Sequence, residues 1–386
     1  MDKAINIVAL NIPWPANYGG VIDIYYKLKA LHDSGVKIIL HCFEYERLPA
    51  DELKTVCEKV YYYPRRTGIR SNLTWLPYNV YSRKDKKLIE NLLKNNYPIL
   101  FEGLHTCYYI NDKRLKKRFK IFRECNIEHD YYREIGVAEK NLVRKCFYYL
   151  EAARFRLFQK QVKHADLIVS VSTTDTDYLK QEFPDNKVVF IPCFHENEEV
   201  TAVAGQSDFL LYHAKLSVKE NEKAAIYMIK HVFSQLPYTC IIAGMDPPGS
   251  LYKMATPYPN IRIEPNPPVE RMQQLIRDAQ VNLLITFQGT GLKLKLLNSL
   301  FAGRHIVVNP LMLAGSGLDT LCHIAQTPQQ MTDYCRQLMI QPFTQADIDR
   351  RKKQLFPVYS NKYQAQRLIE LIFGASKRLS KFLLAQ

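Results

Sequence analysis

The sequence has no apolar run that approaches the ~20 residues needed to cross a bilayer as a helix, so a membrane-spanning protein is not expected. Its nine cysteines are odd in number and include no C-x-x-C pair, which disfavours both a disulfide framework and a structural zinc site. No D-x-D pair of aspartates is placed directly after a predicted strand, and we therefore expect no catalytic metal. The opening stretch, MDKAINIVALNIPWP, has a strand pattern without a signal-peptide cleavage region. These absences favour a cytoplasmic protein with reduced thiols.

The chain does have length, apolar content and positive charge. Its 386 residues suit two domains, and 47% of them are hydrophobic, which is enough for ordinary globular cores. The formal net charge of +15 favours an acidic partner: nucleic acid, an anionic membrane surface or a phosphorylated substrate. Nucleic acid ranks lowest, because the 25 tyrosines follow no RNP-like or helix-turn-helix pattern and the basic residues are dispersed.

Residues 281–310 form the segment around which the sequence is organised. A short apolar run at 281–285 predicts a buried parallel strand, and the glycines after it permit a tight turn. Leucines at helical spacing predict a helix that ends at Gly303, followed by a strand at 306–308. In such a βαβ unit the loop and the helix N-terminus can bind an anion, and two nearby lysines favour phosphate. A structural turn with solvated lysines is the alternative. The candidate phosphate-binding residues are Gly289, Thr290, Gly291, Lys293 and Lys295.

The wording of this segment, GTGLKLKLLNSLFAGRHIVV, resembles the nucleotide-sugar motif of the group 1 (family four) retaining glycosyltransferases, G-x-G-x-K-x-K-x-L-E-A-x-A-x-G-x-P-V-V. The resemblance implies the α/β GT-B fold, in which two Rossmann-like, doubly wound domains face each other across a cleft. The chain departs from the family at Asn298, where a glutamate usually binds the donor ribose, and at Thr290, where a second glutamate usually lies. Asn298 can still hydrogen-bond a ribose hydroxyl, although it is neutral, and we assign it to donor binding.

A glycine pair in the first half of the chain continues the resemblance. Gly19 and Gly20 close the loop that follows a predicted strand at 5–10 and precede a predicted helix at about 21–34. In GT-B enzymes this loop lies near the donor phosphates, so we assign both glycines to donor binding. The alternative is that they only permit a sharp turn.

Two histidines compete for one expected role. The family tends to carry a histidine near the end of a strand that contributes to the donor-sugar site. His105 follows the predicted strand at 99–101, and His129 follows a strand-like piece at 121–125. Either histidine fits that role, and a structural role is the alternative for each. A single long helix is then predicted over about 137–164.

The second half of the chain opens after an acidic, small-residue linker at 196–207. The stretch 213–217, HAKLS, resembles the family's G-R-L-S loop, with Lys215 at the position of an arginine that binds the diphosphate. The family's partner lysine, one turn further on, falls at Glu220 here, with Lys219 beside it. We expect an acceptor domain at 1–195, joined by a C-terminal helix at about 358–386, and a donor domain at 208–357.

The resemblance implies transfer of a sugar from a nucleotide-diphosphate sugar to a hydroxyl of a glycan or lipid-linked acceptor, with retention, in cell-surface polysaccharide synthesis. The nucleotide sugar is a substrate, and no cofactor is expected. Helix N-terminal amides, Lys215, Lys293 and Lys295 would bind the leaving diphosphate as its charge develops. A retaining member needs no covalent nucleophile, and none is assigned. A catalytically weak nucleotide-sugar-binding subunit and a GT-B sugar-nucleotide epimerase are the alternatives.

The densest basic run, DKRLKKRFK at 112–120, is the candidate for contact with a membrane. Each basic residue near an anionic leaflet adds roughly 1 kcal/mol of attraction, and a lipid-linked acceptor would make such contact useful. We therefore expect a cytoplasmic enzyme that docks reversibly on the inner membrane face. A solvated helix end is the alternative. The candidate patch comprises Lys113, Arg114, Lys116, Lys117, Arg118 and Lys120.

Overall fold

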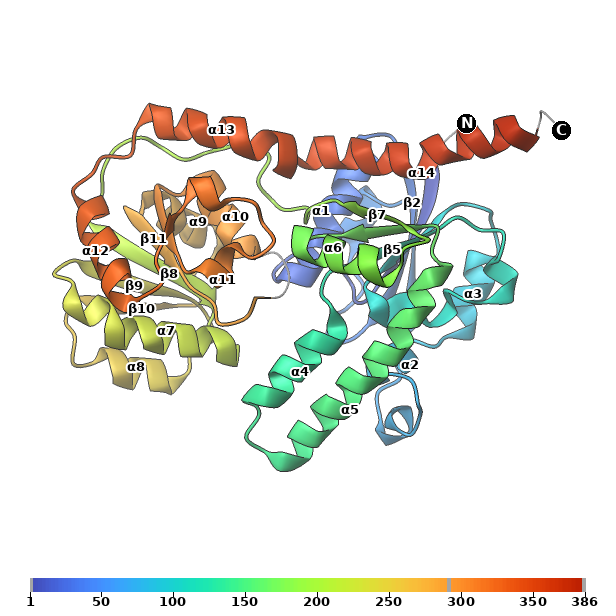
Figure 1. Cartoon of the computed structure of the whole chain (residues 1–386), viewed down its shortest axis with the longest axis horizontal. Coiled ribbons are helices and arrows are strands. Elements are labelled where there is room, and N and C mark those ends of the chain that lie inside the picture. The colour runs from blue at the N-terminus through green and yellow to red at the C-terminus, as the bar shows by residue number, and fades with distance from the viewer. Residues whose placement is uncertain (1–2, 290–292, 384–386) are drawn as a thin grey trace. The chain divides into compact units, whose positions relative to one another are not determined.

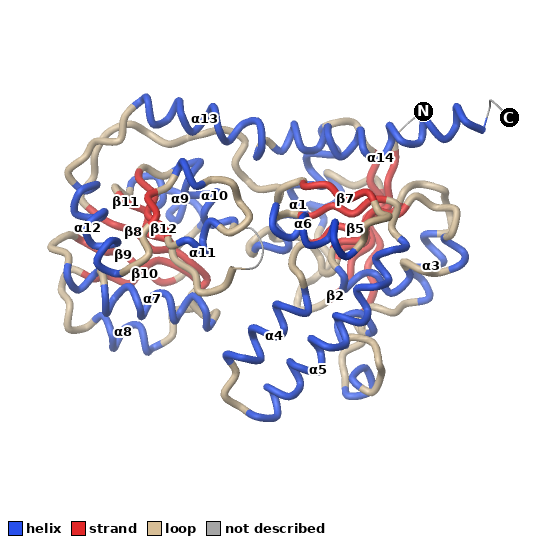
Figure 2. Tube along the Cα trace, viewed as in Figure 1, coloured by secondary structure: helices blue, strands red, loops and turns tan. Residues whose placement is uncertain are grey.

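The computed structural model of the chain describes residues 3–289 and 293–383. It divides into two compact units, Met1–Glu196 with Tyr359–Gln386, and Asn197–Val358 (Figure 1). Each unit contains one parallel β-sheet with helices packed against it (Figure 2). The α/β class expected from the sequence is therefore confirmed.

The first unit is built on seven parallel strands in the order β3-β2-β1-β4-β5-β6-β7. The order reverses between β1 and β4, which pair with Asn6 opposite Ile99. In open parallel sheets, ligands bind beyond the carboxyl ends of the strands at such a switch point. The strands are β1 Ala4–Ala9, β2 Lys37–Glu44, β3 Lys59–Pro64, β4 Ile99–Glu102, β5 Lys120–Glu124, β6 Leu167–Ser170 and β7 Lys187–Phe190.

Strand β1 shows why this sheet needs helices on both faces. All six of its residues are buried, and alternate side chains of a strand point to opposite faces. Ile5 and Ile7 pack in a cluster with residues of α1 and α14, whereas Val8 packs in a second cluster with residues of α3 and α5. The helices of this unit are α1 Gly19–Asp33, α2 Tyr78–Tyr81, α3 Lys86–Leu92, α4 Glu128–Ala138, α5 Leu142–Phe158, α6 Thr173–Glu182 and α14 Asn361–Leu383.

The second unit repeats this plan with six parallel strands in the order β10-β9-β8-β11-β12-β13. Its order reverses between β8 and β11, which pair with Leu210 opposite Val281. The carboxyl ends of β8 and β11 therefore mark the position where a ligand is expected. The strands are β8 Phe209–Lys215, β9 Thr239–Met245, β10 Ile261–Pro265, β11 Val281–Leu284, β12 His305–Val308 and β13 His323–Ile324.

Helices pack against both faces of the second sheet as well. Leu210 and Tyr212 lie in one cluster with residues of α7 and α12, and Leu211 lies in another with residues of α9. The strand, loop, helix and strand predicted over 281–310 are present as β11, α10 and β12. The remaining helices are α7 Lys219–His231, α8 Gly249–Ala255, α9 Val269–Asp278, α10 Leu294–Ala302, α11 Pro310–Leu313, α12 Pro328–Met339 and α13 Gln345–Tyr359.

The long helix predicted over about 137–164 is confirmed over most of that range, as α5 Leu142–Phe158 and the 3-10 helix Gln159–His164, but it begins five residues later than predicted. Helix α4 ends at Ala138 and α5 begins at Leu142, so α4 and α5 form a helical hairpin. Asn141 causes the break, because its side chain accepts hydrogen bonds from Val143 N and Arg144 N, both at 3.1 Å. Such a cap satisfies backbone donors that a new helix leaves unpaired.

The segment 196–207, expected to be a linker, packs on the second unit. The backbone N–H groups of Thr201 and Ala202 both donate to Phe301 O, at 2.8 and 3.1 Å, and Gly205 forms a β-bridge with Phe343. Within the described residues, no helix is both long and apolar enough to cross a bilayer.

Candidate functional site

The loop that follows β11 is held at its start by residues from two other strand ends. Thr286 N donates to Asn309 Oδ1 at 3.1 Å, and Asn309 Nδ2 donates to Thr286 O at 2.7 Å. Glu220, in the first turn of α7, accepts from Phe287 N at 3.0 Å and from the Thr286 hydroxyl. Glu220 therefore anchors this loop, at the position where the resemblance places a phosphate-binding lysine.

Lys295, in the first turn of α10, lies beside this loop. Its Nζ donates to Asn221 Oδ1 at 3.3 Å and to Ile285 O at 3.4 Å, and lies 5.3 Å from the centre of the Tyr212 ring. Burial lowers the pKa of Lys295 to about 8, although nearby Glu220 opposes the shift. Within the described residues, the direct contacts of this ammonium group are with neutral groups, so an anion could bind its charge.

Lys215 and Lys295 are linked through Asn221. Asn221 Nδ2 donates to Lys215 O at 3.0 Å, while its Oδ1 accepts from Lys295. The Lys215 side chain is exposed at the end of β8, and Lys293 occupies the capping position just before α10. The structure thus gathers three of the predicted lysines at the switch point of the second sheet. Sequence reasoning missed Asn221, although its place in the first turn after β8 was a signal for it.

Two other predicted donor-site residues of this unit, Asn298 and Gly289, lie in α10 and in the loop before it. Asn298, in the second turn of α10, accepts from Asn197 Nδ2 at 2.9 Å and is half-buried. Gly289 lies four residues before Lys293 in the same loop and is half-buried. Thr290 and Gly291 lie outside the described residues.

Close backbone packing at the end of β9 explains a glycine that the sequence did not single out. A Cβ on Gly244 would lie 1.7 Å from Ala214 O, far inside any tolerable contact. Strand β8 pairs with β9 directly here, with Ala214 opposite Gly244. The end of β8, which carries Lys215, therefore requires glycine on its neighbour.

In the first unit, Gly19 and Gly20 begin helix α1 directly after the loop that follows β1. The N-cap residue, Tyr18, provides no side-chain cap, so this helix start can offer backbone N–H groups to an anion. Both glycines therefore lie on the side of the first sheet where its strands end, close in sequence to its switch point.

Near the switch point of the first sheet, four buried charged side chains contact one another in a network of ion pairs. Arg123 Nε and Nη2 donate to the two oxygens of Asp23 at 3.0 and 2.9 Å. Lys27 Nζ lies 3.1 Å from Asp23 Oδ2 and 2.8 Å from Glu102 Oε1. All four side chains are buried. Burial opposes ionisation of Asp23, but Arg123 and Lys27 hold the pKa of that carboxyl below its usual range.

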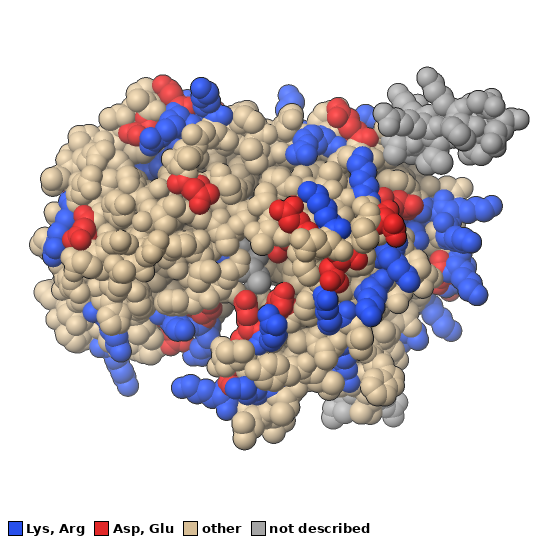
Figure 3. Space-filling view, in the orientation of Figure 1, with Lys and Arg blue, Asp and Glu red and all other residues tan. Residues whose placement is uncertain are grey.

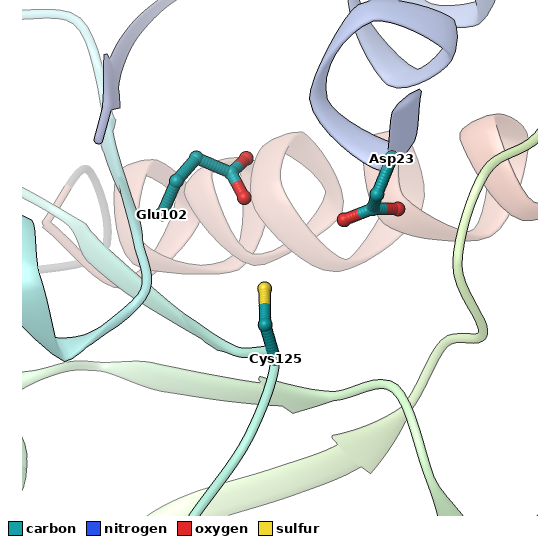
Figure 4. A group of neighbouring side chains, drawn as sticks. All are labelled: Asp23, Glu102 and Cys125. Carbon is teal, nitrogen blue, oxygen red and sulfur yellow. The ribbon is translucent and has the colours of Figure 1, made fainter. Parts of the chain in front are cut away.

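Two of these carboxyls also lie near a thiol. Oxygens of Asp23 and Glu102 and the sulfur of Cys125 lie within 4.8 Å of one another and point inward (Figure 4). Both carboxylates are already bound by Lys27 and Arg123, and burial raises the pKa of the Cys125 thiol well above its ordinary value. A metal would have to displace two cations and a proton, so this cluster does not fit a metal site.

Of the two candidate histidines, His105 lies closer to the switch point of the first sheet. It follows β4 in a 3-10 helix, Leu104–Tyr109, and its Nε2 is 3.6 Å from Glu128 Oε2. Burial lowers the pKa of His105 to about 3 and raises the pKa of Glu128 to about 8. A neutral imidazole therefore faces a protonated carboxyl at neutral pH. Among the described contacts, His105 Nδ1 has no hydrogen-bond partner.

His129 lies one strand further along, in the first turn of α4. Its Nε2 is 3.8 Å from Asp130 Oδ2, and its ring centre is 6.1 Å from that of Tyr178. Burial lowers its pKa. His105 and His129 thus occupy different strand ends, and His105 lies beside Glu128, whose pKa burial raises.

Replacement of Glu128 by glutamine tests this description of the pair. The folded pKa of about 8 lies above the ordinary value of 4.5, so wild-type stability falls as pH rises from 4.5 towards 8. Glutamine resembles the protonated acid and has no such loss. We expect Glu128→Gln to exceed the wild type in stability by less than about 1 kcal/mol at pH 5 and by roughly 3 kcal/mol at pH 7, measured by thermal unfolding. A variant that is less stable at both pH values would contradict the raised pKa.

The predicted membrane patch at 112–120 is wrong for two of its six residues. The Arg118 guanidinium is buried and donates to the backbone carbonyls of Leu92, Asn95 and Tyr97. Lys120 is buried, with Nζ donating to Ile110 O at 3.1 Å. Arg114 forms a bidentate pair with Asp112. Several basic side chains of this run therefore bind backbone carbonyls or a carboxylate of the first unit, and the run is not simply a solvent-facing patch.

Comparisons with known proteins place the fold but not a family. No protein-family model matches the chain. A curated protein from Klebsiella pneumoniae, named "Uncharacterized 44.6 kDa protein in cps region", is 29% identical over 185 residues, 46% of this chain and 47% of that protein. The chain therefore spans about half the length of the curated relative it matches.

Solved structures are similar over nearly the whole chain. TarM of S. aureus, in complex with Fondaparinux, alpha-GlcNAc-glycerol and UDP, is 9% identical with a TM-score of 0.63, covering 96% of this chain and 100% of its own. Anabaena Alr3699/HepE, with UDP and glucose, is 10% identical with a TM-score of 0.55, covering all of both chains. A trehalose-phosphate synthase from Burkholderia vietnamiensis is 11% identical with a TM-score of 0.63, covering 96% and 97%. Together with the two parallel α/β units, these likenesses show that the chain has the GT-B fold of glycosyltransferase structures.

Proposed function

We propose that the chain is a glycosyltransferase that moves a sugar from a nucleotide-diphosphate sugar to a hydroxyl of a glycan or lipid-linked acceptor, with retention. The observation that carries this proposal is Lys295. An ammonium group is held at the switch point of the second sheet, and its direct contacts among the residues the structure describes are with neutral groups. Lys293 lies two residues before it, and Asn221 links it to the end of β8. This arrangement suits a diphosphate, which brings the missing negative charge.

The leaving diphosphate would gain charge as the bond to the sugar breaks. Lys215, Lys293 and Lys295 would stabilise that charge more strongly in the transition state than in the bound substrate, which accelerates the reaction. The sequence around Gly289 would supply backbone N–H groups to the same anion. In the first unit, His105 is the stronger candidate for a contact with the donor sugar, because it follows β4 at the switch point of the first sheet and lies beside Glu128. No residue is assigned as a nucleophile.

The similar proteins support the choice of the first ligands to test and of a pathway. TarM and HepE are both described in complex with UDP, so UDP and UDP-sugars are the donors to try first. The K. pneumoniae relative is named for a cps region, which supports a role in cell-surface polysaccharide synthesis. A lipid-linked acceptor would also require contact with a membrane surface.

A screen of nucleotides and nucleotide sugars by thermal unfolding tests the proposal. A ligand present at about 100 times its dissociation constant should stabilise the folded chain by about 2.7 kcal/mol. We expect one nucleoside diphosphate, both free and as its nucleotide sugars, to raise the unfolding temperature. The absence of stabilisation by UDP, GDP and their sugars would overturn the proposal.

A catalytically weak nucleotide-sugar-binding subunit is the second candidate. Glu220 favours it, because a carboxylate stands where the resemblance places a phosphate-binding lysine and bonds to Thr286 and Phe287 instead. Donor hydrolysis and sugar transfer separate the two candidates. A chain that binds the donor tightly, yet turns it over no faster with any acceptor than without, would be such a subunit.

A further inference from the structure

The hairpin of α4 and α5 projects from the sheet of the first unit (Figure 1). The two helices pack closely, and a Cβ on Gly136 of α4 would meet Tyr148 Cβ of α5 at 3.4 Å. One face of α5 is buried through Glu151, Ala152, Phe155 and Phe158. This face packs Phe155 and Phe158 into the core of the first unit.

The opposite face of α5 is apolar and uncovered. Its exposed residues recur at steps of three and four, which places them along one side of a helix. Leu142 is 77% exposed and Leu157 is 64% exposed. A helix of a globular protein normally turns such a stripe towards its core, so an exposed stripe indicates a missing partner. The stripe comprises Leu142, Cys146, Tyr149, Leu150, Ala153 and Leu157.

A neighbouring loop adds two more exposed apolar side chains. Trp75 is 94% exposed and Leu73 is 79% exposed. Hydrogen bonds join this loop to α5: Arg154 Nη2 donates to Asn72 O at 3.1 Å, and Tyr78 N donates to Glu151 Oε2 at 2.8 Å. The stripe, Leu73 and Trp75 together are called the α5 surface below.

Basic residues outnumber acidic ones along α5 and the turn before it. Residues 139–160 contain six Lys or Arg and two Glu, and one of those glutamates, Glu151, is buried against Arg154. In the space-filling view the hairpin is largely uncharged, with basic and a few acidic side chains at its margins (Figure 3). Lys140, Arg144 and Lys160 are exposed. An apolar stripe bordered by basic residues matches the apolar interior and anionic headgroups of a bilayer leaflet.

We propose that the α5 surface docks on an anionic lipid bilayer. Helix α5 would lie in the plane of the interface with its stripe facing the acyl chains, and Trp75 would sit at headgroup level, where tryptophan and tyrosine are favoured. The basic residues at its edges would contact the headgroups. This inference rests on the membrane contact in the proposed function and moves it from the run at 112–120 to the hairpin.

Vesicle co-sedimentation tests the location of this surface. The chain should bind vesicles of phosphatidylcholine with phosphatidylglycerol and bind phosphatidylcholine alone much more weakly, with binding that falls as salt is added. Replacing Leu150 and Leu157 by glutamate, or Leu73 and Trp75 by serine, should weaken binding roughly tenfold or more. Leu48→Ser is the matched control, since Leu48 is 84% exposed elsewhere in the first unit, and it should bind as the wild type.

Tryptophan fluorescence gives a second readout. The chain has two tryptophans, and Trp14 is already packed against Tyr25, with ring centres 4.9 Å apart. In a Trp14→Phe variant, Trp75 is the single probe. Its emission should shift to the blue on addition of anionic vesicles and stay unchanged with neutral ones.

Three results would overturn the proposal. They are no binding to anionic vesicles, equal binding by the stripe variants and Leu48→Ser, or a dimer that the stripe variants convert to monomer while vesicles have no effect. The last would make the surface an interface between two copies of the chain. Thermal stabilisation by nucleotides, measured on the same variants without lipid, separates this test from that of the proposed function.

Discussion

Asp23→Asn should lower the free energy of unfolding of the first unit by about 3–5 kcal/mol, the usual cost of removing one partner from a buried ion pair. The substitution leaves Arg123 and Lys27, both fully buried, with Glu102 as the remaining carboxylate of the network. It also weakens the hydrogen bond that Asp23 Oδ1 accepts from Phe194 N at 2.7 Å. Urea unfolding followed by tryptophan fluorescence measures the loss, since Trp14 and Trp75 both lie in the first unit.

Asp33→Asn is the matched control for this experiment. Asp33 is on the same helix and pairs with Lys29 at 3.4 Å, but both side chains are solvent-exposed. Removing an exposed pair should cost less than about 1 kcal/mol. Should Asp23→Asn fail to fold, Arg123→Lys keeps the charge but loses the bidentate geometry, and a graded loss is expected. Equal effects of Asp23→Asn and Asp33→Asn would show that the network is not a closed ionic core.

Lys295→Met should weaken binding of UDP by about 1.5–3 kcal/mol, or roughly 10- to 150-fold. Methionine keeps most of the length of the buried stem while it removes the charge. Lys253→Met, on an exposed position of α8 in the same unit, controls for the loss of one positive charge. Isothermal titration calorimetry with UDP measures the difference, and unchanged affinity in Lys295→Met would remove this residue from the site.

The same lysine predicts a pH dependence. Burial sets the pKa of unliganded Lys295 to about 8, so its charge is present below that pH and lost above it. An ordinary lysine keeps its charge to about pH 10. Affinity for UDP should therefore begin to fall above about pH 8 in the wild type. In Lys295→Met, affinity for UDP should not show the part of this decrease that comes from Lys295. Any effect of pH on the nucleotide itself should be the same in the variant and the wild type.

The segment 281–310 shows how much the sequence could predict. Its strand, helix and second strand are local features, written in apolar spacing and glycine positions, and the structure contains all three. The switch points at β1 and β4 and at β8 and β11 could not be read in that way, because strand order depends on pairings between distant segments. The convergence of Lys215 and Lys295 through Asn221 is one result of that order.

Errors arose where the same local pattern permits opposite burial. The basic run at 112–120 suggested a patch that faces a membrane or solvent, yet Arg118 and Lys120 donate to backbone carbonyls inside the unit. The leucines of α5 have helical spacing, but that spacing does not say which face meets a partner. Asp23 and Arg123 are 100 residues apart, and nothing local to either one announces the other. Asn141, by contrast, was a readable capping signal within the helix predicted over 137–164.

The distribution of thiols provides the native chain with its own chemical reporter. Of the nine cysteines, all free, Cys146 is the one with an exposed side chain, and it lies in the middle of the α5 stripe. Burial raises the pKa of Cys42, Cys57, Cys107 and Cys240, so these thiols should react slowly with a maleimide while the chain is folded. The rate of alkylation at a single unengineered position would therefore report how much of the α5 surface is covered, whatever covers it.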